Sequence, residues 1–233
     1  MTATRRRNAT YYTGDLRRDL LDAALRAVET AGPSVVTLRA LARELGVSHA
    51  APAHHFPDKT ALFTAIALEG FTLLEHAMTE ALTALPSSAG GVAQLRATGI
   101  AYLRFALTHR AHFEVMWRDD LLDSDSAPLA EAGDATFAHL AAGVRAAQAE
   151  GWAAGADPRD AAFLAWSTVH GLAALWLAGP LRSLADRPFD EVADAVAGLL
   201  TATLRPSAPA SRPRPPGPTS TAVPDPTLRG DPT

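Results

Sequence analysis

The sequence predicts an all-α protein of about nine helices, and three observations lead to this prediction. Apolar residues recur at helical spacing in several segments. No segment sustains the alternation of apolar and polar residues that a half-buried strand requires. Ser, Thr, Asp, Gly and Pro stand at the places where the helices would begin and end. The chain has 233 residues, 48% of them hydrophobic, which is enough for a sizeable core.

The first expected helix covers residues 15–31, and its apolar face is formed by Leu20, Leu21, Ala24, Leu25 and Val28. Gly32 and Pro33 end it, because glycine accepts the conformation of a helix end and proline cannot continue a helix. Residues 37–56 then predict two short helices joined by a tight turn. Thr37 is expected to cap the first of them, Gly46 to end it, and Ser48 to cap the second, over residues 49–55.

Two helices joined by a short glycine-containing turn form a helix-turn-helix, whose second helix enters the DNA major groove. An ordinary helical hairpin has the same spacing, so the pattern alone leaves both interpretations open. Asp58 is expected to cap a long helix from Lys59 to about Leu85 that belongs to two domains. Further helices are expected over about 92–109, 112–117, 129–148, 158–178 and 189–204.

The run from Tyr11 to Phe71 resembles the N-terminal domain of TetR-type transcriptional regulators. The residues that carry the resemblance are Leu21, Ala24, Gly32, Thr37, Leu41, Ala42, Gly46, Val47, Ser48, Phe56, Lys59 and Leu62. The resemblance implies a three-helix DNA-binding domain, joined by the long helix to an effector-binding and dimerising bundle. We expect a flexible basic arm (1–13), a DNA-binding domain (14–74), a C-terminal domain (75–204) and a disordered tail (205–233) that holds nine of the 17 prolines.

The resemblance also implies which residues meet double-stranded DNA. The start of the second helix would face base edges with His49, Ala50, Ala51 and Pro52. Arg39, Ser48, His54, His55 and Lys59 are expected to contact DNA phosphates, and Thr37 stands at the start of the helix-turn-helix. Two positions depart from the usual pattern: Ala53 replaces a tyrosine found in many relatives, and Pro52 lies within the expected helix. An alternative interpretation is therefore a helical ligand-binding or interaction protein with a weakened reading head.

In the C-terminal half, Trp166, His170 and Gly171 resemble the Trp/His/Gly motif of one TetR subgroup, and residues 102–117 resemble its aromatic segment. This implies an apolar or aromatic small-molecule effector and a homodimer formed through the last two helices. The candidate ligand-binding residues are Tyr102, Phe105, His112, Phe113, Met116, Trp117, Trp166 and His170. An ordinary helical core uses the same residue types, so both interpretations stay open.

Charge and composition restrict the other classes of function. The net charge is −4, but residues 1–60 carry +3 and the remainder −7, so the positive end is the expected DNA-binding end. No paired carboxylates, nucleophile motif or metal-ligand pattern is present, so we expect neither an enzyme nor a metal or other cofactor. Residues 161–178 are apolar enough for a membrane check, but a buried helix is the favoured interpretation. We expect a cytoplasmic repressor that acts on a pseudo-palindromic operator.

Overall fold

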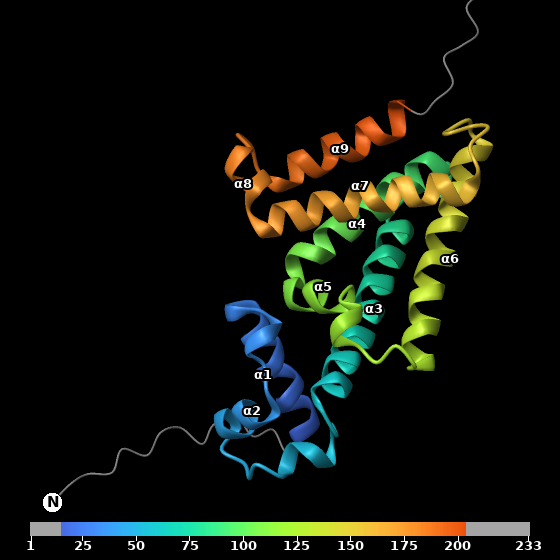
Figure 1. Ribbon diagram of the computed structural model, residues 1–233. Coiled ribbons are helices and arrows are strands. Elements are labelled where there is room, and N and C mark those ends of the chain that lie inside the picture. The colour runs from blue at the N-terminus through green and yellow to red at the C-terminus, as the bar shows by residue number, and fades with distance from the viewer. Residues whose placement is uncertain (1–14, 204–233) are drawn as a thin grey trace, which may run out of the picture.

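The computed structural model describes residues 15–203, and the expected arm and tail lie outside this range. The described part contains nine α-helices, three short 3-10 helices and no strand, which confirms the all-α prediction. Figure 1 shows a small helical unit formed around α1 (Leu16–Ala31) and α2 (Leu38–Leu45), from which the long helix α3 (Lys59–Thr83) extends into a larger bundle.

The small unit contains α1 (Leu16–Ala31), α2 (Leu38–Leu45) and the 3-10 helix Pro33–Val35. Local sequence determines the ends of these helices as expected. The Asp15 carboxylate accepts a hydrogen bond from the Arg18 amide at 3.2 Å, and the Thr37 hydroxyl accepts one from the Ala40 amide at 3.1 Å. Gly46 ends α2 with φ of +70°, a left-handed conformation that glycine adopts without steric penalty.

The second helix of the helix-turn-helix is shorter than predicted. Instead of an α-helix over residues 49–55 capped by Ser48, the chain forms a 3-10 helix, Ala51–His54, preceded by a turn at His49 and Ala50. Its hydrogen bonds join residues three apart, from the Ala53 amide to the Ala50 carbonyl and from the His55 amide to the Pro52 carbonyl. Proline lacks an amide proton, so Pro52 removes a bond that an α-helix here would need.

Helix α3 (Lys59–Thr83) belongs to both cores, as the sequence predicted. Its first part contributes Leu62, Phe63 and Ile66 to the core of the small unit. Its second part contributes Phe71, Leu74 and other residues to the core of the larger bundle. The two sets of buried residues divide α3 between Ile66 and Ala67, earlier than the expected domain boundary at residue 74.

The larger bundle contains α4 (Gly91–Thr108), α5 (Arg110–Met116), α6 (Ala127–Ala149), α7 (Pro158–Ala178) and α9 (Phe189–Thr203). A 3-10 helix, Asp119–Leu121, follows α5. The Asp157 carboxylate caps α7 as predicted, accepting from the Arg159 amide at 2.8 Å. The short helix α8 (Pro180–Leu184) was not predicted; it forms because Gly179, at φ of +107°, redirects the chain and Pro180 begins a new turn.

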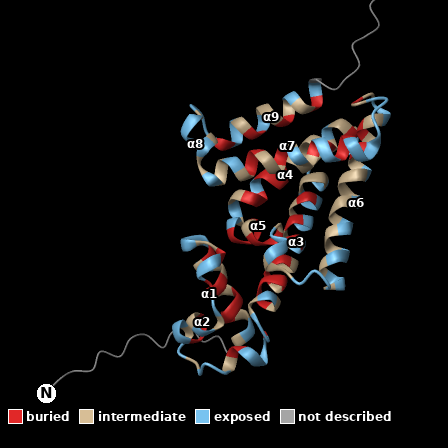
Figure 2. Ribbon diagram, in the orientation of Figure 1, coloured by how far each residue is buried: buried red, intermediate tan, exposed pale blue. Residues whose placement is uncertain are grey.

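Several segments of the C-terminal helices are exposed (Figure 2), and some of their exposed residues have large apolar side chains. They are Phe163, Leu164 and Leu175 on α7, Leu184 on α8 and Leu199 on α9. Helices α3 and α7 have the length and mean hydropathy of membrane-spanning helices, and half of the most apolar window of α3 is buried within the fold. Core helices of soluble proteins pass the same test, and α7 contributes Val169, Leu172 and Ala173 to the core of the bundle.

Candidate DNA interface and effector pocket

The residues expected to meet DNA gather at the far end of the small unit. Helix α2, the turn after it and the 3-10 helix Ala51–His54 with its cap carry exposed residues: Arg39, Ser48, His49, His54 and His55. Ala50 and the capping Thr37 are also exposed, and Ala51 is half-buried. These side chains are therefore accessible to a DNA duplex placed against this end.

Pro52 and Lys59 are placed differently from the others. Pro52 is buried, and its carbonyl accepts hydrogen bonds from the amides of His55 at 3.0 Å and Phe56 at 2.9 Å. The Pro52 ring therefore packs inside the small unit and is not accessible to DNA. Lys59 is half-buried; its ammonium donates to the Pro33 carbonyl at 2.9 Å and lies 5.1 Å from the centre of the Phe63 ring. Lys59 ties the start of α3 to the segment before α2.

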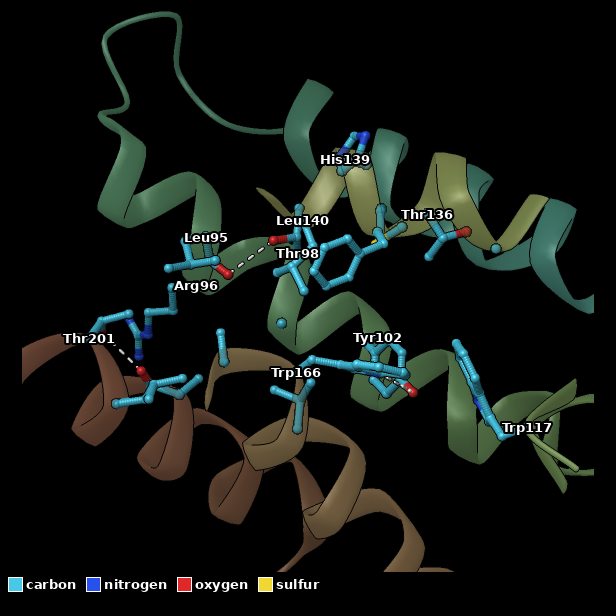
Figure 3. A pocket seen from close by; sticks show the side chains of 18 residues that line it. Leu95, Arg96, Thr98, Tyr102, Trp117, Thr136, His139, Leu140, Trp166 and Thr201 are labelled. Carbon is cyan, nitrogen blue, oxygen red and sulfur yellow. Dashed lines mark hydrogen bonds between the residues drawn. The ribbon is translucent and has the colours of Figure 1, made fainter. Parts of the chain in front are cut away.

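An apolar cavity of about 90 Å³ lies inside the larger bundle. Its walls come from five helices and from the residue after α5. Figure 3 shows Arg96, Thr98 and Tyr102 of α4, Thr136 and His139 of α6, Trp166 of α7 and Thr201 of α9 around this space, with Trp117 at one end. The other lining residues are Met78, Leu95, Gly99, Gly133, Phe137, Leu140, Ala165, Val169, Ala197 and Leu200.

Three residues of the aromatic and Trp/His/Gly segments form a hydrogen-bonded group beside the cavity. The Tyr102 hydroxyl lies 2.8 Å from His170 Nδ1, and the Trp166 indole donates to the same hydroxyl at 3.4 Å. Burial raises the pKa of the Tyr102 hydroxyl and lowers the pKa of His170, because each charged form would lose its hydration. A neutral His170 has one ring nitrogen as donor and the other as acceptor, so the group works without a buried charge.

Three of the eight expected ligand-binding residues, Tyr102, Trp117 and Trp166, line this cavity. The other five, Phe105, His112, Phe113, Met116 and His170, are not among its lining residues. Phe105, Phe113 and Met116 are buried in the core instead. His170 lies behind the cavity wall, where it is bonded to Tyr102 and makes ring contacts with Trp117 and Trp166.

His112 belongs to a polar group at the junction of the small unit and the bundle. Its Nε2 lies 3.3 Å from Glu69 Oε1, and the other Glu69 oxygen accepts from the Arg18 guanidinium at 2.7 Å. Arg18 also pairs with Asp22 on its own helix. Burial lowers the pKa of His112, with Glu69 opposing that shift. Helices α1, α3 and α5 are thereby joined by one chain of contacts.

Sequence reasoning missed most of the cavity wall, above all Arg96 and the residues of α6 and α9. Thr98, Thr136 and Thr201 interrupt otherwise apolar helix faces, which is the one signal that points to them. Each of these hydroxyls donates to a carbonyl of its own helix, at 2.9 to 3.1 Å. Small polar residues of this kind are common in ordinary helices, so the signal is weak.

The fold and these two sites define a helix-turn-helix protein with an apolar cavity in a second helical domain. Residues 20–66 match the family described as bacterial regulatory proteins, tetR family. Residues 95–200 match the family described as tetracyclin repressor-like, C-terminal domain. The chain belongs to the TetR family of transcriptional regulators. The two matched regions contain the helix-turn-helix and most of the cavity wall.

Individual relatives support the assignment of this chain to the TetR family. The HTH-type transcriptional regulator BetI of Escherichia coli is 37% identical over 84 residues, which cover 36% of this chain and 42% of BetI. The HTH-type transcriptional repressor Rv1474c of Mycobacterium tuberculosis is 38% identical over 80 residues, covering 34% of this chain and 38% of that protein. The chain thus matches less than half the length of these two regulators.

A solved structure extends the similarity over nearly the whole fold. It is a protein with unknown function from Rhodococcus sp. RHA1, 36% identical to this chain, with a TM-score of 0.70. The match covers 84% of this chain and 99% of the Rhodococcus chain. The similarity therefore includes the C-terminal bundle, which the shorter matches to BetI and Rv1474c leave untested.

Proposed function

We propose that this protein is a ligand-responsive repressor that binds a pseudo-palindromic operator as a homodimer in the cytoplasm. The observation that carries the proposal is the continuity of α3. Lys59 at its first residue is bonded to the segment before α2, and Met78 near its other end lines the cavity. A helix of 25 residues spans about 37 Å, so one rigid element joins the reading head to the cavity wall.

An effector would act by fitting one arrangement of the bundle better than another. The cavity of about 90 Å³ is smaller than typical ligand pockets of about 300–1,000 Å³, so binding requires the surrounding helices to separate. Displacement of Met78 would turn α3 and change the distance between the two reading heads of a dimer. The effect on operator affinity equals the difference between the affinities of the effector for the two arrangements.

The dimer interface is proposed on α7 and α9. Leu164 and Leu175 of α7 are 47% and 49% exposed, and Leu199 of α9 is 63% exposed. Covering these side chains against the same helices of a second copy would remove them from water, and a two-fold axis places the same surface on both sides. Leu175→Glu should convert the dimer to a monomer in sedimentation, whereas Val35→Glu, at an equally exposed apolar residue of the small unit, serves as a control away from these helices.

Binding of the purified protein to its own upstream DNA, at several salt concentrations and with scrambled DNA as control, tests the proposal. We expect specific binding with a steep salt dependence, because phosphate contacts release counterions. Absence of specific binding there would lead to a selection from random sequences. Failure in both experiments would refute the repressor function and favour the alternative of a ligand-binding protein with a weakened reading head. Two features of the structure favour this alternative: Pro52 is buried, and the second helix of the helix-turn-helix is only a short 3-10 helix.

Substitutions separate DNA contact from folding. Arg39→Ala should weaken operator binding and reduce the slope of log affinity against log salt by about one, while changing stability by less than about 0.5 kcal/mol, since Arg39 is exposed. Lys59→Ala should reduce both the affinity and the melting temperature, because the ammonium is bonded inside the fold. Arg145→Ala, an exposed arginine on α6, is the matched control and should change neither. Equal loss of affinity in Arg39→Ala and Arg145→Ala would contradict the placement of the interface.

A further inference from the structure

Two hydrogen-bond donors in the cavity wall have no partner. They are the Nε of Arg96 and the indole Nε1 of Trp117, and they are the only buried side-chain nitrogen or oxygen atoms of residues 15–203 left without a hydrogen bond. Both residues line the cavity. A buried donor without an acceptor lowers the stability of the fold, so an unpaired donor calls for an explanation, and an acceptor on a bound ligand is one.

The two donors lie at opposite ends of the cavity, as Figure 3 shows for Arg96 and Trp117. Arg96 and Tyr102 are separated by six positions on α4, which corresponds to about 9 Å along the helix axis. Trp117 lies beyond Tyr102, with the two ring centres 6.5 Å apart. A ligand that satisfies both donors therefore has to be elongated and to carry an acceptor at each end.

Between Arg96 and Trp117, the threonine, tyrosine and tryptophan side chains of the cavity wall already have hydrogen-bond partners. The hydroxyls of Thr98, Thr136 and Thr201 donate to backbone carbonyls, and Tyr102 and Trp166 bond to each other. Most of the remaining lining is aliphatic, aromatic or glycine, with half-buried His139 as the other polar side chain. The middle of the ligand therefore meets a mainly apolar surface.

The charge of the ligand follows from the partner of Arg96. One terminal nitrogen of its guanidinium pairs with Asp194 at 2.7 Å, so the positive charge is already opposed. A ligand carboxylate at Nε would lie close to the Asp194 carboxylate, and the two negative charges would repel each other. A carbonyl oxygen accepts from Nε without that repulsion. At the other end the donor is a neutral indole enclosed by Phe71, Tyr102 and Trp166, which also suits an uncharged acceptor.

We propose that the cavity binds an uncharged, elongated apolar or aromatic molecule with a carbonyl-type oxygen at each end, one accepting from Arg96 Nε and the other from Trp117 Nε1. This inference rests on the proposed function and gives the chemical class of its effector. It distinguishes the ligand from a fatty acid or other carboxylate, and from a pure hydrocarbon. It also assigns Arg96, which sequence reasoning did not select, as a residue that determines specificity.

Four probes of nearly equal shape test the proposal by calorimetric titration of the full-length protein. They are para-diacetylbenzene with two carbonyl groups, para-ethylacetophenone with one, para-diethylbenzene with none, and para-acetylbenzoate with a carboxylate. Each hydrogen bond contributes about two- to tenfold in affinity, so the diketone should bind about four- to hundredfold more tightly than the hydrocarbon. The one-carbonyl probe should fall between them, and the carboxylate should bind less tightly than the diketone.

Variants show which atoms produce this preference. Trp117→Phe and Arg96→Met should each reduce the preference for the diketone over the hydrocarbon by about two- to tenfold. Trp176→Phe is the matched control on α7, because Trp176 packs against Phe189 and does not line the cavity. Asp194→Asn removes the partner of Arg96 but leaves Nε in place. It should keep the preference for the diketone and improve binding of the carboxylate.

The indole resonances give a direct readout. The chain has four tryptophans, and the resonance missing in Trp117→Phe identifies the Nε1 proton of Trp117. The diketone should shift this resonance downfield, and the hydrocarbon should not. Equal affinity for diketone and hydrocarbon, a preference unchanged in both variants, or tighter binding of the carboxylate to the wild-type protein would each overturn the proposal. Protein that binds its operator but none of the probes would also overturn it, while leaving the DNA-binding function intact.

Discussion

The contact between α4 and α6 offers a sharp test of how the cavity wall is built. Gly91, the first residue of α4, lies directly against the α6 backbone. A Cβ at this position would fall within 2.6 Å of the Ala147 amide nitrogen and closer still to the Ala146 carbonyl group. Backbone atoms cannot rotate away as a side chain does, so Gly91→Ala has to push the two helices apart.

The magnitude follows from two opposing effects. Forcing a methyl group into a packed contact costs about 1–3 kcal/mol, and the rigid backbone on the far side places this site in the upper part of that range. Alanine in a helix recovers roughly 0.5–1 kcal/mol relative to glycine. The net loss is about 2 kcal/mol, which lowers the melting temperature of a domain of this size by about 4–8 °C.

Thermal unfolding followed by circular dichroism measures this loss, with Gly143→Ala as the matched control. Gly143 lies on α6 itself, and a Cβ there would meet no atom within 4 Å. Gly143→Ala should therefore raise the melting temperature by about 1–4 °C, through helix propensity alone. If Gly91→Ala melted no lower than the wild-type protein, or if both variants lost stability equally, the close approach of α4 and α6 would be refuted.

Two further predictions concern the junction between the domains. A double-mutant cycle on Arg18 and Glu69 should give a coupling energy of about 1 kcal/mol, because Glu69 is partly buried and also contacts His112. The more exposed pair of Arg26 and Glu44 should give about 0.3 kcal/mol, and equal values would argue against a special role for the junction. The second prediction concerns pH. Burial lowers the pKa of His112 below its ordinary value of 6.5. As the pH falls, His112 therefore binds a proton in the unfolded chain before it does so in the folded protein. Stability should therefore fall as the pH drops through about 6.5, and His112→Gln should reduce that dependence; an identical pH profile in the variant would contradict it.

Local chemistry made the ends of helices α2 and α3 predictable from the sequence. Thr37 caps α2 because a threonine hydroxyl reaches the backbone amide three residues ahead, whatever surrounds the helix. Gly46 ends the same helix because glycine alone has no Cβ to oppose a positive φ. The length of α3 followed likewise from the Asp58 cap at its start and from the break that begins at Pro86. These effects act over three or four residues, so the sequence contains them completely.

Only the tertiary structure decided what surrounds the cavity and how Lys59 is used. The cavity wall combines α3, α4, α6, α7 and α9, and no local pattern gives the rotation of one helix against another. Phe113 and Trp117 belong to the same aromatic segment, yet Phe113 is in the core and Trp117 faces the cavity. The Nε of Arg96 and the Nε1 of Trp117 have no partner because the residues packed around them offer no acceptor to these two atoms. Burial and hydrogen-bond partnership depend on all neighbours in space, whereas sequence spacing specifies only those within a few residues along the chain.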